Sequence, residues 1–182
     1  IDYAASMGCG IIIGFLKGGP GSDREVSERL FLESMLELKP YIEEKKVQVL
    51  IEATNHKEAS IIRTLKEGAH VINFLDCPFI QLLADTYHMN IEEPSLVDSL
   101  SEYMNYYPHL HISDDNRAYP GLGSLDFTAI YRKLMECGYK GTVAVEGNIQ
   151  HGLLEDTQIC AAYLHKMCGG LYTPSHVSCH AV

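Results

Sequence analysis

Five short runs dominated by apolar residues recur along the chain, separated by longer segments with the spacing of amphipathic helices. The runs cover residues 11–16, 47–53, 80–86, the start of the stretch 109–127, and 142–146. Most are continuously apolar, as in strands buried on both faces of a parallel sheet. In the fourth, Leu110 and Ile112 alternate with polar residues, as in a half-buried strand.

The segments between these runs carry signals of helix starts and ends. Ser22 and Glu25 have the spacing of a capping box, and Gly8 and Gly138 stand where helix C-terminal caps are expected. Pro40 is expected to kink or restart its helix. Residues 69–78 are left unassigned and 85–94 are interpreted as a loop. The predicted helices cover residues 1–8, 22–46, 57–67, 95–104, 126–137 and 153–168, the last capped by Gly169.

Strands that alternate with helices predict an α/β fold with a parallel sheet and right-handed crossovers. Polar side chains with ligand chemistry stand at or near the ends of four successive predicted strands: Glu52, Asp85, His111 and Glu146. Their separations are 33, 26 and 35 residues, whereas a (β/α)8 barrel of about 250 residues repeats every ~31. We therefore expect one βα unit per gap, with the four side chains converging in the mouth of a TIM barrel.

Three carboxylates and one imidazole form a ligand set of mostly hard oxygen donors. This set suits Mn²⁺, Mg²⁺ or Co²⁺, and Zn²⁺ is also compatible with it. The alternative for each acid alone is a helix cap or an ion pair with a surface lysine. Four such groups at the spacing of one barrel repeat favour the metal site.

Composition narrows the class of protein further. The chain has 182 residues, 46% of them hydrophobic, and a net charge of −10, which predicts one globular domain and argues against a nucleic-acid binder. No apolar run approaches the roughly 20 residues of a membrane-spanning helix, and no signal-peptide pattern is visible. The six cysteines lack paired spacing, which predicts reduced thiols and a cytoplasmic location.

Two other groups of residues contain side chains that can bind a metal, but their positions in the predicted structure do not favour a metal site. His165 and Cys168 lie on a predicted helix, and His176, Cys179 and His180 lie in a predicted loose tail. We therefore do not expect a metal at either group.

Four motifs carry a resemblance to a known family: IEATN with Glu58, ADTYHMNIEE, HLHISDDNRAYPGLGSLDF and VAVEG. With them the chain resembles the C-terminal five βα units of the xylose-isomerase-like sugar isomerase/epimerase barrels. It is most similar to the ketose 3-epimerases (D-tagatose and D-psicose 3-epimerase) and the 5-keto-L-gluconate epimerases. The resemblance implies a partial (β/α)8 TIM barrel over residues 1–170, truncated at its N-terminus, and a tail over 171–182.

The resemblance also implies a function and roles for seven residues. One divalent metal, commonly Mn²⁺, would be bound by Glu52, Asp85, His111 and Glu146, with Glu52 and Glu146 as the acid/base pair. The enzyme would invert a carbon next to the carbonyl of a ketose or keto-sugar acid through a metal-stabilised enediolate. The positions that match substrate-binding residues are Glu58, His88 and Arg117. The family commonly forms dimers or tetramers, so a homo-oligomer acting on a small sugar, without nucleic-acid or membrane partners, is expected.

Two departures from the family pattern leave other functions open. The family's EPLNR motif is Glu-Ala-Thr-Asn-His here, and the family's first three strands are absent. The enzyme alternatives are a ketol isomerase of the inosose or hydroxypyruvate type and an endonuclease IV-like enzyme. The latter would need more metal ligands and a basic rim. The non-enzyme alternative is an inactive truncated remnant.

Overall fold

The computed structural model describes residues 1–168, and it contains one parallel sheet of five strands in the order β1-β2-β3-β4-β5. Neighbours in the sheet are therefore also neighbours in the sequence, as in one arc of a barrel. The strands are β1 (Ile11–Ile13), β2 (Val49–Glu52), β3 (Ile80–Asp85), β4 (His109–Ile112) and β5 (Thr142–Val145). The predicted α/β class and partial barrel are confirmed.

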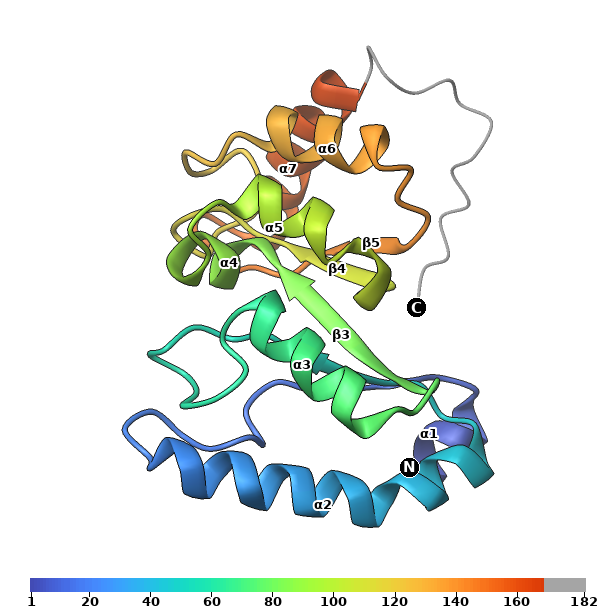
Figure 1. The fold of residues 1–182 in the computed structure, drawn as a ribbon. Coiled ribbons are helices and arrows are strands. Elements are labelled where there is room, and N and C mark those ends of the chain that lie inside the picture. Colours follow the sequence, from blue (N-terminus) through green and yellow to red (C-terminus); the bar gives the residue numbers. More distant parts are fainter. Residues whose placement is uncertain (169–182) are drawn as a thin grey trace.

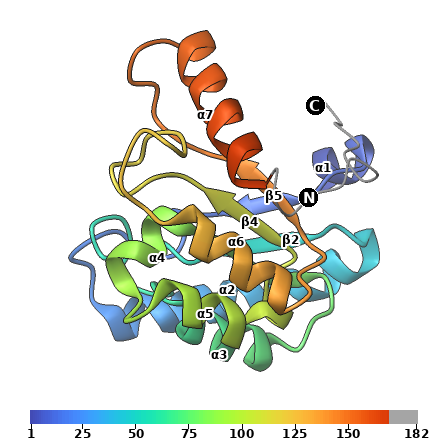
Figure 2. The same cartoon turned by 90° about the horizontal axis from the view of Figure 1, so that it is seen from above.

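The helices between the strands follow one another along the sheet from α2 to α7 (Figures 1 and 2). Helix α3 packs on β3 and against α2, and α5 packs against α6. The helices are α1 (Asp2–Met7), α2 (Arg24–Lys45), α3 (Leu65–Leu75), α4 (Thr86–Glu92), α5 (Leu96–Glu102), α6 (Phe127–Glu136) and α7 (Leu153–Cys168), with a 3₁₀ turn at Met104–Tyr106. This one-directional winding produces a half-barrel.

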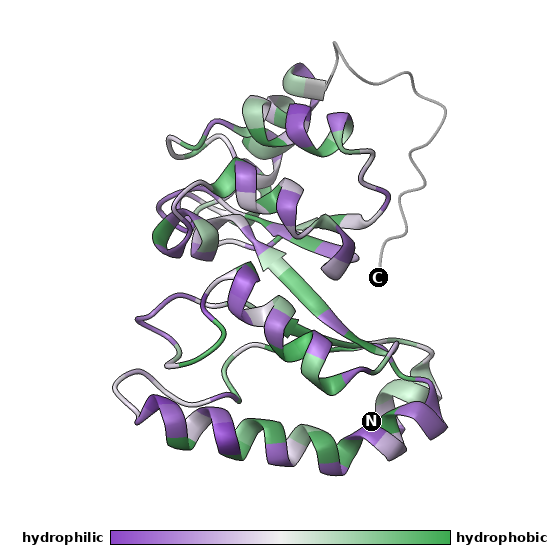
Figure 3. Cartoon of the chain, in the orientation of Figure 1, coloured by the Kyte–Doolittle hydropathy of each residue, from purple (hydrophilic) through white to green (hydrophobic). Residues whose placement is uncertain are grey.

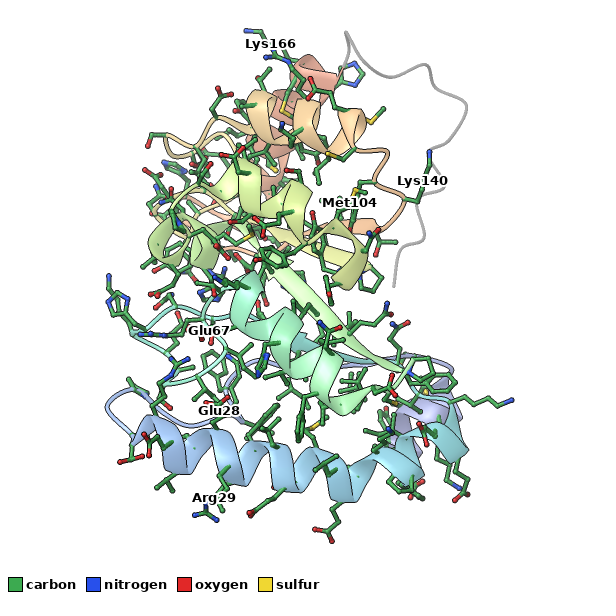
Figure 4. The ribbon with its side chains drawn as sticks, in the orientation of Figure 1. Glu28, Arg29, Glu67, Met104, Lys140 and Lys166 are labelled. Carbon is green, nitrogen blue, oxygen red and sulfur yellow. The ribbon has the colours of Figure 1, made fainter. Side chains whose placement is uncertain are left out.

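The hydrophobic core lies between the sheet and these helices. Strand β3 is mostly hydrophobic in Figure 3, and Leu82, Leu83 and Ala84 within it are fully buried. Helix α2 instead has one buried side and one exposed side. Figure 4 shows Glu28 on the side of α2 that faces α3, whereas its neighbour Arg29 points away from the protein. The buried side of α2 contributes Phe31, Met35 and Ile42 to the core.

The two edge strands are more open than the centre of the sheet. In β1, Ile12 is 48% exposed, and in β5 the side chains of Val143 and Val145 are 37% and 40% exposed. By contrast, β2 and β3 have a strand on each side. Within residues 1–168, neither β1 nor β5 has a second partner strand, as predicted for five units of an eight-unit barrel.

The segment between β2 and β3 corrects the sequence prediction. A helix was predicted at 57–67, but that segment is mostly loop, and α3 begins at Leu65, where Thr64 accepts a hydrogen bond from the Glu67 N–H. The unassigned residues 69–78 contain most of this helix. Gly68 belongs to its first turn rather than its end. There an added Cβ would lie 2.6 Å from Leu82 Cδ2, so the helix approaches β3 through a glycine.

Other boundaries are corrected by local hydrogen bonds. The N-cap of α2 is Asp23 rather than Ser22, because the Asp23 side chain accepts from Val26 N–H. Pro40 lies inside α2, which continues to Lys45 without restarting. The first strand ends at Ile13, and the predicted loop 85–94 contains α4. The caps at Gly8 and Gly138 are confirmed by left-handed φ values of 66° and 70°.

Several sequence predictions concern residues beyond the described range. The Gly169 cap, the boundary at residue 170, the tail and the group at 176–180 all lie there. Up to residue 167, the cysteines are free thiols: Cys9, Cys77, Cys137 and Cys160. Among the described helices, none combines the length and apolar composition needed to cross a lipid bilayer.

Candidate metal centre

The four predicted ligands converge at the carboxyl ends of four adjacent strands. Glu52 and Asp85 are the last residues of β2 and β3, His111 is in β4, and Glu146 directly follows β5. Asp85 and His111 are register partners in neighbouring strands. One ligand-type atom from each of the four residues lies within 4.8 Å of the others. The spacing argument therefore identified one spatial cluster.

His111 is the centre of this cluster. Its Nδ1 lies 3.0 Å from Glu146 Oε2, 3.6 Å from Glu52 Oε1 and 3.9 Å from Asp85 Oδ2. Asp85 is fully buried, Glu52 and His111 are each 7% exposed, and the Glu146 side chain is 48% exposed. The cluster is thus closed toward β2 and β3 and open at Glu146.

The residues fit a divalent cation. Glu52 Oε1 is a buried carboxylate oxygen that has no hydrogen-bond partner within the described part of the chain. A buried polar atom without a partner is costly and calls for a specific explanation. A cation among three carboxylates and one imidazole would give this oxygen a partner, and the donor set is one that Mn²⁺, Mg²⁺, Co²⁺ or Zn²⁺ accepts.

Burial and mutual proximity shift the pKa values of three of these groups. Burial raises the pKa of Asp85 to about 7, although the Arg117 guanidinium opposes this. For His111, burial alone would lower the pKa, but the hydrogen bond with Glu146 and the nearby Glu52 carboxylate outweigh it and raise the pKa to about 9. The hydrogen bond with His111 is the main cause that lowers the pKa of Glu146 to about 2. The cluster therefore holds an imidazolium between carboxylates when no other cation is bound.

Arg117 also reaches this cluster. Its two terminal nitrogens lie 2.6 Å from Asp85 Oδ2 and 2.7 Å from Glu146 Oε2, and it also donates to Ser113 Oγ at 3.2 Å. The backbone of Arg117 is left-handed, with φ of 63°, and the guanidinium lies over the Tyr87 ring. The guanidinium thus bridges two of the four predicted ligands rather than pairing with the acids next to it in sequence.

His88 and Glu58 complete the set of predicted site residues. His88 is buried on α4, and its Nε2 lies 3.8 Å from Glu58 Oε2 and 3.9 Å from Glu52 Oε1. Burial is the largest cause that lowers the pKa of His88 to about 3, followed by Arg117 and Lys17. His88 is therefore a neutral imidazole beside the four predicted ligands. All seven predicted residues lie in one continuous site, whereas their individual roles remain predictions.

Sequence analysis assigned no role to two buried residues at this site. Lys17 was interpreted as part of a plain loop, but it is 1% exposed and its Nζ donates to Thr54 Oγ1. Burial lowers its pKa to about 8. The other is Asn55, which follows β2 and contacts both His88 and Glu58. Their positions in the sequence could have indicated them. Each residue follows the carboxyl end of a predicted strand, and the predicted ligands lie at the same end of the sheet.

The Asp114 carboxylate organises the loop that presents Arg117. It accepts hydrogen bonds from the N–H groups of Asp115 (3.0 Å), Gly121 (3.0 Å), Gly123 (3.0 Å) and Leu125 (2.8 Å). An added Cβ at Gly123 would lie 2.5 Å from Asp114 Oδ1, so glycine is required there. Asp114 is 1% exposed, and the loop therefore folds around a buried carboxylate.

Replacing Asp114 should destabilise the protein strongly. Asp114→Ala would leave four backbone N–H groups without their acceptor, and we expect a loss of about 3–5 kcal/mol in the free energy of unfolding. Asp115→Ala is the matched control, because Asp115 accepts mainly from Ser124 near the surface, and should cost about 1 kcal/mol or less. Urea unfolding measures both, and equal costs for the two variants would contradict this account of the loop.

A parallel half-barrel with a ligand cluster at the carboxyl ends of its strands defines a barrel protein whose site has the composition of a metal centre. The chain belongs to the xylose isomerase-like TIM barrel family, whose model matches residues 1–162.

Its relatives include named epimerases. The chain is 37% identical to the 3-dehydro-D-guloside 4-epimerase of Escherichia coli (strain K12) over 102 residues, which are 56% of this chain and 39% of that protein. It is 30% identical to the L-ribulose 3-epimerase of Methylomonas sp. (strain DH-1) over 138 residues, which are 76% of this chain and 48% of that protein. The chain thus spans less than half the length of these two relatives.

Solved structures agree on the fold. The crystal structure of 3-keto-D-glucoside 4-epimerase from E. coli in its apo form matches with a TM-score of 0.79 and 27% sequence identity. The match covers 91% of this chain and 66% of that one. The half-barrel therefore has the arrangement of the corresponding part of a known epimerase barrel.

Proposed function

We propose that the protein is a divalent-metal-dependent epimerase that inverts a carbon next to the carbonyl of a sugar. The observation that carries this proposal is the convergence of two carboxylates, from β2 and from the end of β5, on His111 Nδ1. Two further strands separate β2 from β5, so Glu52 and Glu146 approach the site from different sides of the arc. The names of the relatives support the same reaction class.

The chemistry needs a base on one side of the carbon and an acid on the other. Glu52 would remove or return the proton from the buried side, and Glu146 would do so from the exposed side, with the roles exchanged when the reaction runs backward. His88 and Arg117 would donate hydrogen bonds to the sugar oxygens on which negative charge develops. A divalent cation, when held by Glu52, Asp85, His111 and Glu146, supplies charge stabilisation to those oxygens.

The choice of sugar and metal belongs to this proposal. The relatives suggest a free ketose, such as D-psicose or L-ribulose, or a 3-keto-glycoside. Mn²⁺ is the proposed ion, and Mg²⁺, Co²⁺ and Zn²⁺ are the alternative ions. A homo-oligomer is also proposed, and sedimentation of the purified protein would measure it.

A substrate panel tests the proposed function. Protein expressed from its full reading frame would be incubated with Mn²⁺ and, separately, with D-fructose, D-tagatose, 5-keto-L-gluconate and a 3-keto-glucoside. We expect one or more of them to be inverted at a carbon next to the carbonyl, and the product to be resolved by chromatography. Absence of inversion for all four, in protein shown to hold metal, would overturn the proposal.

Metal affinity should depend on pH because a metal ligand must be deprotonated. In the metal-free site His111 has a pKa of about 9 and Asp85 of about 7. Below these values a proton must leave before the cation binds, so apparent affinity should rise from pH 6 to pH 9 and level off above. Calorimetric titration in buffers of different ionisation enthalpy measures both the affinity and the released protons. An affinity that is flat across this range would contradict the assignment.

A further inference from the structure

Asn55 is a fully buried residue of the loop after β2, and every polar atom it has is used. Its carbonyl oxygen accepts from the N–H groups of Glu58 and Ala59 at 2.9 and 3.0 Å. Its backbone N–H and its side-chain amide are both directed to nearby side chains. Such complete use of a buried asparagine indicates a fixed orientation.

Two contacts determine which way the Asn55 amide points. The backbone N–H of Lys57, which can only donate, lies 2.9 Å from Oδ1. The carboxylate of Glu58, which can only accept when ionised, lies 3.3 Å from Nδ2. If the oxygen and the NH₂ group of the amide were exchanged, the NH₂ group would face the Lys57 N–H, and the oxygen would face the Glu58 carboxylate. Neither pair could form a hydrogen bond. The NH₂ group of Asn55 therefore faces Glu58 and His88.

This orientation determines the hydrogen position on the His88 ring. Asn55 Nδ2 lies 2.8 Å from His88 Nδ1, and the Asn55 backbone N–H donates to the same ring nitrogen at 3.3 Å. Two donors directed at Nδ1 require that it accept, so it carries no hydrogen. The ring is then neutral, with its hydrogen on Nε2.

The Nε2–H group faces the interior of the site. Glu58 Oε2 and Glu52 Oε1 lie 3.8 and 3.9 Å from Nε2, which is too far for a hydrogen bond to either. Within residues 1–168, Glu52 Oε1 has no hydrogen-bond partner. A donor on His88 is thus directed toward the space between two carboxylates, where a substrate oxygen would be accepted.

We propose that Asn55 is a positioning residue that fixes His88 as a hydrogen-bond donor at Nε2 and links it to Glu58. The role of this donor toward a sugar oxygen rests on the proposed function, whereas the hydrogen position does not. With Nδ1 held by Asn55, His88 presents a donor and no acceptor to the substrate. His88 would therefore favour a substrate whose hydroxyl or carbonyl oxygen accepts a hydrogen bond from Nε2–H.

The hydrogen position can be measured directly. Protein expressed from its full reading frame, labelled with ¹⁵N-histidine and loaded with diamagnetic Mg²⁺, would be studied by long-range ¹H–¹⁵N correlation NMR, with His88 assigned by loss of its signals in His88→Gln. We expect the shifts of a neutral ring with bare Nδ1 and protonated Nε2. A hydrogen on Nδ1, or an imidazolium at neutral pH, would overturn the proposal without any variant of Asn55.

Asn55→Asp tests the link to function. This isosteric change replaces the side-chain donor, the nearer of the two at Nδ1, by an acceptor. We expect a population with hydrogen on Nδ1 and a fall in kcat of about 10-fold. Asn73→Asp, the same change on the exposed side of α3, should alter neither. An Asn55→Asp protein with an unchanged His88 spectrum and unchanged kcat would refute the positioning role. If the spectra agree with expectation but no sugar is inverted by the wild type, the proposed function fails and the hydrogen assignment stands.

Discussion

Glu52→Gln and Glu146→Gln should each lower the rate of epimerisation by about a thousandfold or more. A glutamine can neither remove nor return the proton at the carbon next to the carbonyl, and a positioned acid or base contributes about 10²–10⁴-fold to rate. Each change also weakens a ligand of the proposed metal. Because Glu52 is buried and Glu146 is half exposed, the two variants test opposite sides of the site.

Metal content separates the two causes of lost activity. Both variants would be analysed for bound metal and assayed at saturating Mn²⁺, with Glu136→Gln on the exposed side of α6 as the matched control. The control should keep wild-type activity. A Glu146→Gln protein that holds metal and retains activity within about tenfold of the wild type would contradict the acid/base assignment.

Removing the metal should abolish activity and lower stability together. If the ion is held by Glu52, Asp85, His111 and Glu146, metal present at 100 times its Kd stabilises the folded state by about 2.7 kcal/mol. Stripping it with a chelator should therefore lower the melting temperature, and adding Mn²⁺ should restore both the melting temperature and the rate. Calorimetry and the epimerase assay measure the two effects.

Histidine variants show whether the response comes from the proposed site. His111→Ala should melt at the same temperature with and without Mn²⁺, because the central ligand is lost. His70→Ala, which removes an exposed histidine on α3, should keep the full shift. A metal-dependent shift that survives in His111→Ala would place the ion elsewhere in the protein.

The cluster of four candidate ligands could be predicted from the sequence because its members occupy equivalent positions at the ends of strands. Each of Glu52, Asp85, His111 and Glu146 stands at the end of an apolar run, and the distance between runs matches one barrel repeat. When consecutive strands are neighbours in a parallel sheet, residues at equivalent positions in these strands lie close together. Locating the strands was therefore sufficient, even where the predicted ends were a few residues too long.

The helices were harder to predict from the sequence where tertiary packing overrides the local spacing of apolar residues. Ile61, Ile62 and Leu65 have helical spacing, but the first two are buried in the loop before α3, with Ile62 at a left-handed φ of 53°. Asp85 combines two roles that the sequence does not separate. Its Oδ1 caps α4 by accepting from Tyr87 N–H at 2.8 Å, while Oδ2 faces Arg117 and His111. A helix start was therefore interpreted as a loop.

Contacts between side chains far apart in sequence could not be predicted at all. Asn55 contacts His88 across 33 residues, and Lys17 contacts Thr54 across 37. Neither pair follows from periodicity, because each depends on how the segments that follow β1, β2 and β3 meet at the carboxyl ends of these strands. The sequence thus located the ligands, whereas the structure was needed to find the residues that orient them.

The most direct test of the central claim is the fate of hydrogen during the reaction. Protein with bound Mn²⁺ would convert the ketose or keto-glycoside that it accepts in D₂O, and the repurified product would be analysed by ¹H and ¹³C NMR. We predict inversion at one carbon next to the carbonyl, deuterium at that carbon and an unmoved carbonyl. In Glu52→Gln and Glu146→Gln we predict neither inversion nor deuterium incorporation. A carbonyl that moves to the neighbouring carbon, or an inverted carbon that keeps all of its original hydrogen, would contradict proton exchange by two carboxylates at this site.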